Sequence, residues 1–302
     1  MTDPAFDAVL DRVGVLAGRP RKVSDLGGGL TNTNLRVTTD DGDYVVRVSA
    51  NTTGLLGIDR DAEHANSISA HTAGVGAEVV DYLPADNVLV LRFLNGRTLA
   101  AEDVVPRTDR IAQALRTLHA GPVFVSDFDM RQIRRRYLEA VLAEGIRIPE
   151  DYLALEPAYE RLEEALGRDP EPPVPCNNDL LAANFIEDGE RMWIIDYEYA
   201  GQNEPSFELG NLASENGLDE SHTAALSSAY WGEDDDRKVA RALAWALLAR
   251  YGWTLWAAIQ AAVSEIEFDF WSWGMEKYDV AREAALDGSL ERLGRRLEGA
   301  AR

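Results

Sequence analysis

The sequence predicts an α+β protein built of two lobes, a small β-rich N-terminal lobe over residues 1–95 and a larger, mainly helical C-terminal lobe over residues 96–302. The first observation behind this prediction is that alternating, β-branched segments are concentrated before residue 95. The second is that helical periodicity dominates from Ala101 onward, except around residues 174–199. A chain of 302 residues with 46% hydrophobic content is also long enough to bury a core in each lobe.

The N-terminal lobe is expected to contain a hairpin, a helix and two further strands. The alternating stretches "TNLRVTT" and "YVVRVSA" are joined by the turn sequence "DDGD", so residues 23–48 are predicted to form a hairpin. Helical spacing of Ala, His and Glu follows over about residues 58–73. The segment "AEVVDYLPADNVLVLRFL" supplies the two strands, and strand character stops near "NGRTL". We therefore expect the lobe boundary near Asn95 and Gly96.

The composition argues against several functional classes. The net charge of −22 is unfavourable for binding nucleic acid or an anionic membrane surface; an acidic, solvated surface explains it better than a cationic partner does. No apolar run approaches the roughly 18 residues of a membrane span, and the acidic N-terminus lacks the order of a signal peptide. Cys176 is the only cysteine, so an intramolecular disulfide is impossible and a cytoplasmic location is expected. Monomer and homodimer both remain open.

Three side chains in the segment "CNNDLLAANF" and the later "IIDYEYAG" have the types and order of a phosphoryl-transfer site. Asp179 and Asn184 have the spacing D-x-x-x-x-N, and "FIEDGERMWII" reads as a hairpin that delivers Asp196 at the end of a strand. Asp179 can accept the proton of an attacking hydroxyl. Asn184 and Asp196 offer the hard oxygen ligands that Mg²⁺ prefers. D-x-x-x-x-N alone is a weak signal, and a polar surface hairpin is the alternative.

The N-terminal half contains three features that this chemistry also needs, in the expected order. The glycine-rich "LGGGLTNTN" (residues 26–34) lies between two predicted strands, where backbone N–H groups can approach phosphates. Arg47 in the next strand can supply a cation, since no lysine occurs between Lys22 and Lys238. Glu63 in the following helix can orient that cation. Separately, each feature has an ordinary explanation: a flexible turn, a solvated strand residue and a polar helix face.

Together these segments resemble the choline/ethanolamine kinase branch of the aminoglycoside-phosphotransferase-like superfamily. The resemblance covers nearly the whole chain and rests on "GGGLTNTNLRV", "YVVRV", "CNNDLLAANF", "IIDYEYAGQNEPSFELGNLASE" and "YGWTLWAAIQAAVSEIEFDFWSWGMEKYDVA". It implies a protein-kinase-like fold and transfer of the γ-phosphate of ATP, with Mg²⁺, to the hydroxyl of a small amino alcohol. It also implies Asp179 as the base and Asn184 and Asp196 as metal ligands. The nucleotide-binding residues expected from it are Gly28, Gly29, Thr31, Asn32, Arg47, Glu63, Phe93 and Leu94.

The chain departs from the family pattern at two positions. The family usually has His-Asn-Asp where this sequence has Asn177, Asn178 and Asp179, and that histidine organises the loop by hydrogen bonding. None of the four histidines of the chain lies in this loop. An asparagine can also donate and accept hydrogen bonds, although it is shorter. The second departure is Glu208 in "FELGN", where the family commonly has the shorter Asp.

Tryptophans suggest where the acceptor binds. Trp253 and Trp256 have the i, i+3 spacing that places both on one face of a helix, and aromatic faces attract ammonium groups. An aromatic stripe on a helix is more often part of a core than of a binding cage. The resemblance favours the cage, because Trp253, Trp256 and Trp273 match aromatic positions that hold the trimethylammonium group of choline. It also places Glu215 beside that pocket.

Three functions are consistent with these observations. The first is an ATP-dependent kinase for choline or a related amino alcohol. The second is an aminoglycoside-type antibiotic phosphotransferase, which the acidic charge suits and the tryptophan-rich C-terminal segment does not. The third is a nucleotide-binding protein with impaired catalysis, motivated by Asn177; the presence of Asp179, Asn184 and Asp196 argues against it.

Overall fold

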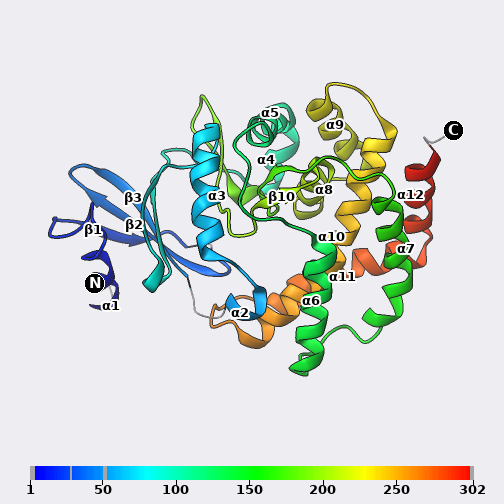
Figure 1. Ribbon diagram of the computed structural model, residues 1–302, viewed down its shortest axis with the longest axis horizontal. Coiled ribbons are helices and arrows are strands. Elements are labelled where there is room, and N and C mark those ends of the chain that lie inside the picture. The colour runs from blue at the N-terminus through cyan, green and yellow to red at the C-terminus, as the bar shows by residue number, and fades with distance from the viewer. Residues whose placement is uncertain (1–3, 28, 50–52, 300–302) are drawn as a thin grey trace.

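The computed structural model describes residues 4–27, 29–49 and 53–299 of the chain. One end of the molecule is a β-sheet and the other consists of helices, with α1 (Pro4–Leu10) on the side of the sheet and α12 (Ser289–Glu298) at the helical end (Figure 1). This arrangement confirms the predicted α+β fold class with a β-rich N-terminal part and a mainly helical remainder.

The N-terminal lobe contains a five-stranded antiparallel sheet with the order β1-β2-β3-β5-β4. The predicted hairpin is present, because β2 pairs with β3 from Asn32↔Ser49 to Thr39↔Gly42. A further strand, β1, precedes it and places the glycine-rich segment between two paired strands. The bounds are β1 (Lys22–Asp25), β2 (Asn32–Thr39), β3 (Gly42–Ser49), β4 (Val79–Leu83) and β5 (Val88–Arg92).

One long helix, α3 (Arg60–Ala73), crosses beside this sheet (Figure 1). It begins at Asp59, whose side chain accepts hydrogen bonds from the first backbone N–H groups, and ends at Gly74 with φ 89°. The apolar face of the sheet forms its own core, in which Val37, Val46 and Val90 are fully buried together with residues that follow α1 (Pro4–Leu10). The alternation read in the sequence therefore marks which strand residues face inward.

The helical lobe is organised around α10 (Asp236–Val263), a helix of 28 residues that packs against α6, α8 and α11. Gly210 allows the close crossing of α8 and α10, since a Cβ there would lie 2.3 Å from the carbonyl oxygen of Ala242. The remaining helices are α2 (Thr53–Leu56), α4 (Ala101–Val104), α5 (Thr108–His119), α6 (Met130–Ala143), α7 (Glu156–Gly167), α8 (Pro205–Glu215), α9 (Glu220–Trp231), α11 (Phe270–Leu286) and α12 (Ser289–Glu298).

Short strands lie between α7 and α8, where the helical periodicity was interrupted. β7 (Val174–Cys176) pairs with β10 (Gly201–Asn203), and the predicted hairpin forms from β8 (Phe185–Glu187) and β9 (Met192–Ile194). The prediction that strand character stops near "NGRTL" is wrong for two residues, because β6 (Arg97–Thr98) pairs with β8. Only this distant partner makes the segment a strand.

The predicted lobe limits, residues 1–95 and 96–302, stay a proposal that the pairing of the strands supports. The last strand of the five-stranded sheet ends at Arg92, and the next strand pairs with the other lobe. Among the described helices, none is long and apolar enough to cross a membrane.

Candidate active site

A single cavity of about 400 Å³ is lined by both lobes. Its walls come from the glycine-rich segment, from β3 and the chain after β5, from the two loops that follow β7 and β9, and from α8, α10 and α11. Most of the residues predicted as site residues line it: Gly29, Thr31, Arg47, Phe93, Leu94, Asp179, Asn184, Asp196, Glu215, Trp253, Trp256 and Trp273. Segments far apart in the sequence are thus brought together at one surface.

Two predicted nucleotide-binding residues do not line the cavity, and one lies outside the described residues. Asn32 and Glu63 are buried behind residues that do line it, and they hold those residues by hydrogen bonds. Glu63 thus contacts Arg47, the cation that it was predicted to orient, and the role of both residues in nucleotide binding stays a prediction. Gly28 falls at a residue that the structure does not describe.

The loop after β7 presents Asp179 to the cavity. Its backbone carbonyl accepts a hydrogen bond of 2.7 Å from the side-chain amide of Asn184, which fixes the two ends of the D-x-x-x-x-N segment to each other. Asn178, between β7 and Asp179, has φ 67°, a left-handed conformation that asparagine tolerates better than most residues. Its amide donates to the carbonyl of Tyr199 at 3.0 Å and so joins this loop to the loop after β9.

Asn177 organises the loop although it replaces the family's usual histidine. Its amide nitrogen donates to the carbonyls of Ile195 and Asp196 at 3.2 and 2.8 Å, and its Oδ1 accepts from the backbone N–H of Asp179 at 3.1 Å. The side chain is fully buried. Asparagine therefore ties the loop of the predicted base to the loop of the predicted metal ligand, using both the donor and the acceptor of its amide.

Replacing Asn177 with Asp should show how much this tie contributes. The carboxylate has nearly the same shape but cannot donate to the two carbonyls, and it adds a charge beside two other acidic groups. We expect kcat to fall at least tenfold, which corresponds to a lost buried hydrogen bond and the cost of leaving its partners unpaired. Steady-state kinetics with a parallel melting curve would measure this. An unchanged kcat would mean that the Asn177 amide does not set the loop geometry.

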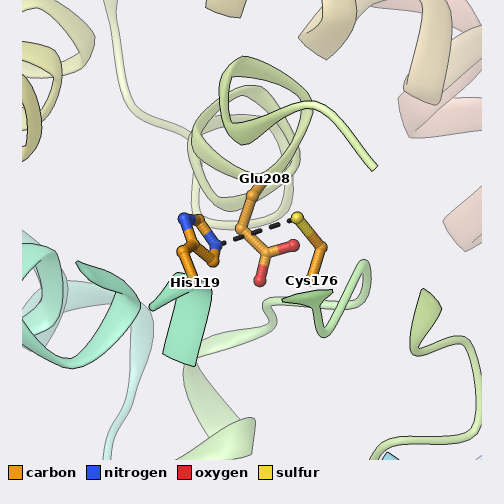
Figure 2. Close-up of side chains that lie close together, drawn as sticks. All are labelled: His119, Cys176 and Glu208. Atoms are coloured by element: carbon orange, nitrogen blue, oxygen red, sulfur yellow. Dashed lines mark hydrogen bonds between the residues drawn. The ribbon is translucent and has the colours of Figure 1, made fainter. Parts of the chain in front are cut away.

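A buried cluster of His119, Cys176 and Glu208 lies beside the loop that follows β7 (Figure 2). The Glu208 carboxylate accepts the backbone N–H groups of Asn177 and Asn178 at 2.9 and 3.0 Å. The extra methylene of Glu208, compared with the family's Asp, is thus accommodated, and its carboxylate still reaches the loop. Burial nevertheless raises the pKa of Glu208 to about 7.

His119 supports this cluster from α5 and does not replace the missing histidine of the loop. Its Nε2 lies 3.8 Å from the sulfur of Cys176, and its Nδ1 lies 2.6 Å from the hydroxyl of Tyr230. Burial lowers the pKa of His119 to about 3, so the ring is neutral at physiological pH. Both ring nitrogens of His119 and both carboxylate oxygens of Glu208 therefore have hydrogen-bond partners inside the protein.

Arg47 on β3 reaches the loop after β9, as the order of motifs predicted. Its guanidinium lies 2.8 Å from Glu63 of α3 and 2.6 Å from Asp196. Burial alone lowers the pKa of Arg47, but the charges of Asp196, Glu63 and Glu198 outweigh burial and raise it, so the group stays charged. A fixed cation therefore stands between the sheet and Asp196, whose backbone has φ 65°.

Glu198 is a residue of this site that sequence reasoning missed. Its carboxylate lines the cavity, accepts hydrogen bonds from Thr31 and Asn32 of the glycine-rich segment at 2.9 and 3.0 Å, and pairs with Arg60 at 3.2 Å. Burial, reinforced by nearby Asp196, raises the pKa of Glu198 to about 7. The signal was present in "IIDYEYAG", where a second acidic residue follows Asp196 by two positions.

The oxygen atoms that face the cavity form a donor set that suits Mg²⁺. Asn184, Asp196 and Glu198 all line it, and together they offer amide and carboxylate oxygens, the hard ligands of this ion. Withdrawal of Asp179 from bulk water raises its pKa well above the ordinary range, and the charges of Asp196 and Glu215 add to this effect. Acidic groups concentrated in one cavity, with the pKa values of Asp179 and Glu198 both raised, indicate a candidate functional site that suits cations.

The glycine-rich segment and the chain after β5 line the part of the cavity where nucleotide is predicted to bind. A Cβ at Gly29 would lie only 2.2 Å from the carbonyl oxygen of Asn32, so this turn requires glycine. Phe93 and Leu94 line the opposite wall, and the guanidinium of Arg36 lies 4.0 Å from the centre of the Phe93 ring. The cavity is thus apolar where a base would stack and polar where phosphates would lie.

At the other end of the cavity the predicted aromatic residues converge. Trp256 and Trp273 are in edge-to-face contact with ring centres 5.5 Å apart, and Trp253 contacts Tyr199 in the same way at 5.2 Å. The indole N–H of Trp256 donates to the hydroxyl of Tyr199 at 2.7 Å. Trp253 and Trp256 come from α10 and Trp273 from α11, so the packing of these two helices closes this end.

The comparison with known protein families agrees with the site described above. The profile of the choline/ethanolamine kinase family matches residues 23–238, which include both loops described above. The chain belongs to the choline/ethanolamine kinase family. Ethanolamine kinase 2 of Mus musculus is 28% identical to it over 91% of this chain and 83% of that protein.

Solved structures agree with the family assignment. A crystal structure of a choline/ethanolamine kinase family protein from Mesorhizobium loti has a TM-score of 0.83 at 29% identity, over 97% of this chain and 98% of that chain. An aminoglycoside 2′-phosphotransferase bound to GDP has a TM-score of 0.65 at 16% identity, over 95% of this chain and 98% of that chain, which shows the shared fold. The predicted family and the predicted enzyme class, a phosphotransferase with an alcohol acceptor, are therefore confirmed, and the likeness to the aminoglycoside phosphotransferase is one of fold.

Proposed function

We propose that this choline/ethanolamine kinase family member transfers the γ-phosphate of ATP, with Mg²⁺, to the hydroxyl of a small amino alcohol. The observation that carries the proposal is that one cavity is lined by the Asp179 carboxylate, by a set of Mg²⁺-type oxygen ligands and by three tryptophans, and that Asp179 feels the charges of both Asp196 and Glu215. The arrangement provides the two binding regions that a transfer between nucleotide and amine requires. The name of the mouse relative, an ethanolamine kinase, supports the acceptor class.

In the proposed reaction, Asp179 accepts the proton of the acceptor hydroxyl as the oxygen attacks phosphorus. Its backbone is fixed by Asn177 and Asn184, so the carboxylate is held in place before the substrates bind. Burial raises the pKa of Asp179, and the charges of a bound metal ion and of a cationic acceptor would favour the ionised form that can act as a base.

The nucleotide phosphates would lie between the two lobes. Asn184 and Asp196 would hold the metal ion, which supplies electrostatic stabilisation of the transferred phosphoryl group when bound. Arg47 would fix the Asp196 carboxylate and add positive charge on the phosphate side, and Glu63 would orient the arginine from behind. The glycine-rich segment would cover the phosphates with backbone N–H groups.

An ATP-consumption screen with purified protein tests this proposal. The acceptors are ethanolamine, its N-methylated derivatives up to choline, and a panel of aminoglycosides, each with and without Mg²⁺. We expect turnover with at least one amino alcohol, dependent on Mg²⁺. Turnover with aminoglycosides alone would replace the proposed acceptor class, and nucleotide binding without any turnover would contradict catalysis.

Trp256 provides a test of the acceptor end. Substitution with Leu removes the aromatic face and the N–H donor to Tyr199 but leaves part of the buried volume filled, unlike Ala, which would cost about 3–5 kcal/mol of stability at this buried site. We expect the KM for the amine to rise about tenfold through the loss of a cation–π contact, and the KM for ATP to remain within about twofold. A rise in both KM values would show that the change is not local to the acceptor end.

A further inference from the structure

A buried lysine sits at the acceptor end of the cavity. Lys277 on α11 points its ammonium at Glu215, at 2.5 Å from Oε2, and over the ring of Trp273, at 4.0 Å from its centre. Both of these partners line the cavity, and the side chains of Lys277 and Glu215 are only 7% and 3% exposed. The protein therefore carries its own ammonium group at the place where the aromatic end of the cavity meets its acidic residue.

This lysine changes what the acceptor end can bind. It neutralises Glu215 and occupies the face of Trp273, which are two of the features expected to attract a quaternary ammonium. A primary and a quaternary ammonium bring the same positive charge beside Lys277, but the quaternary group has no N–H donor, so it would gain little there from an acceptor atom of the protein.

One hydrogen-bond acceptor at this end of the cavity, a carboxylate oxygen of Glu215, is unpaired among the described residues. The second carboxylate oxygen of Glu215, Oε1, is buried and has no hydrogen-bond partner among the described residues. A buried carboxylate oxygen without a partner is costly, and a ligand N–H that reaches it removes the cost. Only an ammonium that carries hydrogen can donate in this way.

We propose that Lys277 makes the acceptor end selective for amino alcohols with a primary ammonium group over those with a quaternary one. In this arrangement the ligand ammonium donates to Oε1 of Glu215 while Lys277 holds Oε2. The proposal rests on the proposed function, since it names the acceptor subclass of that same cavity. It was not visible in the sequence, although Lys277 is one of only three lysines in the chain.

The chain contains a matched control for this arrangement. Lys238 also lies over a tryptophan, 3.9 Å from the ring centre of Trp231, and also pairs with a glutamate, 2.7 Å from Glu171. None of these three residues lines the cavity. A Lys238→Met variant thus removes the same kind of interaction without touching the acceptor end.

The experiment measures both binding and turnover for the wild type, Lys277→Met and Lys238→Met. Binding of ethylammonium and of ethyltrimethylammonium, which have no hydroxyl to phosphorylate, is followed by tryptophan fluorescence. Turnover is measured as kcat/KM for ethanolamine and for choline. We expect the wild type to favour the primary amine in both assays, Lys277→Met to reduce this preference at least tenfold, and Lys238→Met to leave it unchanged.

A preference that persists in Lys277→Met, or a wild type that binds ethyltrimethylammonium more tightly, would overturn the inference. If Lys277→Met does not fold, the Glu215→Gln variant tests the inference instead. This variant should weaken the binding of ethylammonium about tenfold more than the binding of ethyltrimethylammonium. Equal weakening of both would overturn the inference. A failure of the proposed function can be distinguished from a failure of this inference. The first would appear as no turnover of any amino alcohol, whereas the binding preference can be measured without turnover.

Discussion

Asp179→Asn is expected to abolish phosphoryl transfer and to leave nucleotide binding nearly intact. The amide is almost the same size as the carboxylate, so the loop fixed by Asn177 and Asn184 should keep its shape. It cannot accept a proton, however, and a positioned general base contributes roughly 10²–10⁴ in rate. We expect kcat to fall by about that factor, measured by coupled ATP-consumption kinetics, with the dissociation constant of ATP measured by calorimetry.

An exposed carboxylate on α5, Asp109, serves as the control, because Asp109→Asn makes the same chemical change on the surface. Its kcat should match that of the wild type. If Asp179→Asn retained more than about a tenth of the wild-type kcat, the carboxylate could not supply a base contribution of the usual size, and its role would be limited to electrostatics.

The second large effect is expected at Asp196. Substitution with Asn suits this position better than Ala, because the residue has φ 65° and asparagine tolerates that left-handed conformation. The change removes a charged metal ligand, while Arg47 keeps its ion pair with Glu63. We expect Mg²⁺ to lose most of its effect on nucleotide affinity, so that ATP binds at least tenfold more weakly in its presence than to the wild type.

Calorimetric titration of ATP with and without Mg²⁺ measures this directly. The titration without the metal is the internal control, and it should differ little between variant and wild type. If the variant still bound ATP with the full Mg²⁺ enhancement, the ion would be held by other oxygens of the cavity, with Asn184 and Glu198 as the next candidates.

The ion pairs around Arg47 explain why an arginine can stand where other kinase-like proteins carry a lysine. The Arg47 side chain is nearly enclosed, yet it stays charged because acidic groups contact it from two sides, from α3 and from the loop after β9. Both carboxylates contact one terminal nitrogen of the guanidinium, and its Nε donates to the amide oxygen of Asn34 at 3.4 Å, so the planar group serves three side chains, whereas an ammonium is a single point of charge. The same group can therefore bind the helix, the loop and, in the proposed reaction, the phosphate side of the site.

Much of the fold could be predicted because it depends on local patterns. Alternation marked the strands of the N-terminal sheet, and the turn sequence "DDGD" marked the hairpin between β2 and β3. β1 was implied by the position of the glycine-rich segment. The exceptions were elements such as β6, which is a strand only because it pairs with β8 far along the chain. Two-residue strands have no periodicity that a sequence can show.

The sequence by itself determined which residues are the candidate reactive groups. Phosphoryl transfer needs particular residue types at particular spacings, and the sequence shows them directly in Asp179, Asn184 and Asp196. It also shows the expected order of the glycine-rich segment, Arg47 and Glu63. The structure brings the three C-terminal residues, Arg47 and the tryptophans to one cavity, with Glu63 behind Arg47.

Tertiary structure alone decided how those groups are supported and what surrounds the acceptor. The amide of Asn177 meets two carbonyls of another loop, Glu198 reaches the glycine-rich segment, and Lys277 lies between Glu215 and Trp273. The contact between Lys277 and Trp273 joins residues four apart on α11, and the other contacts join residues far apart in the sequence. Hydrogen bonds, ion pairs and cation–π contacts depend on distances of a few ångströms, and those distances exist only after the helices and loops have packed.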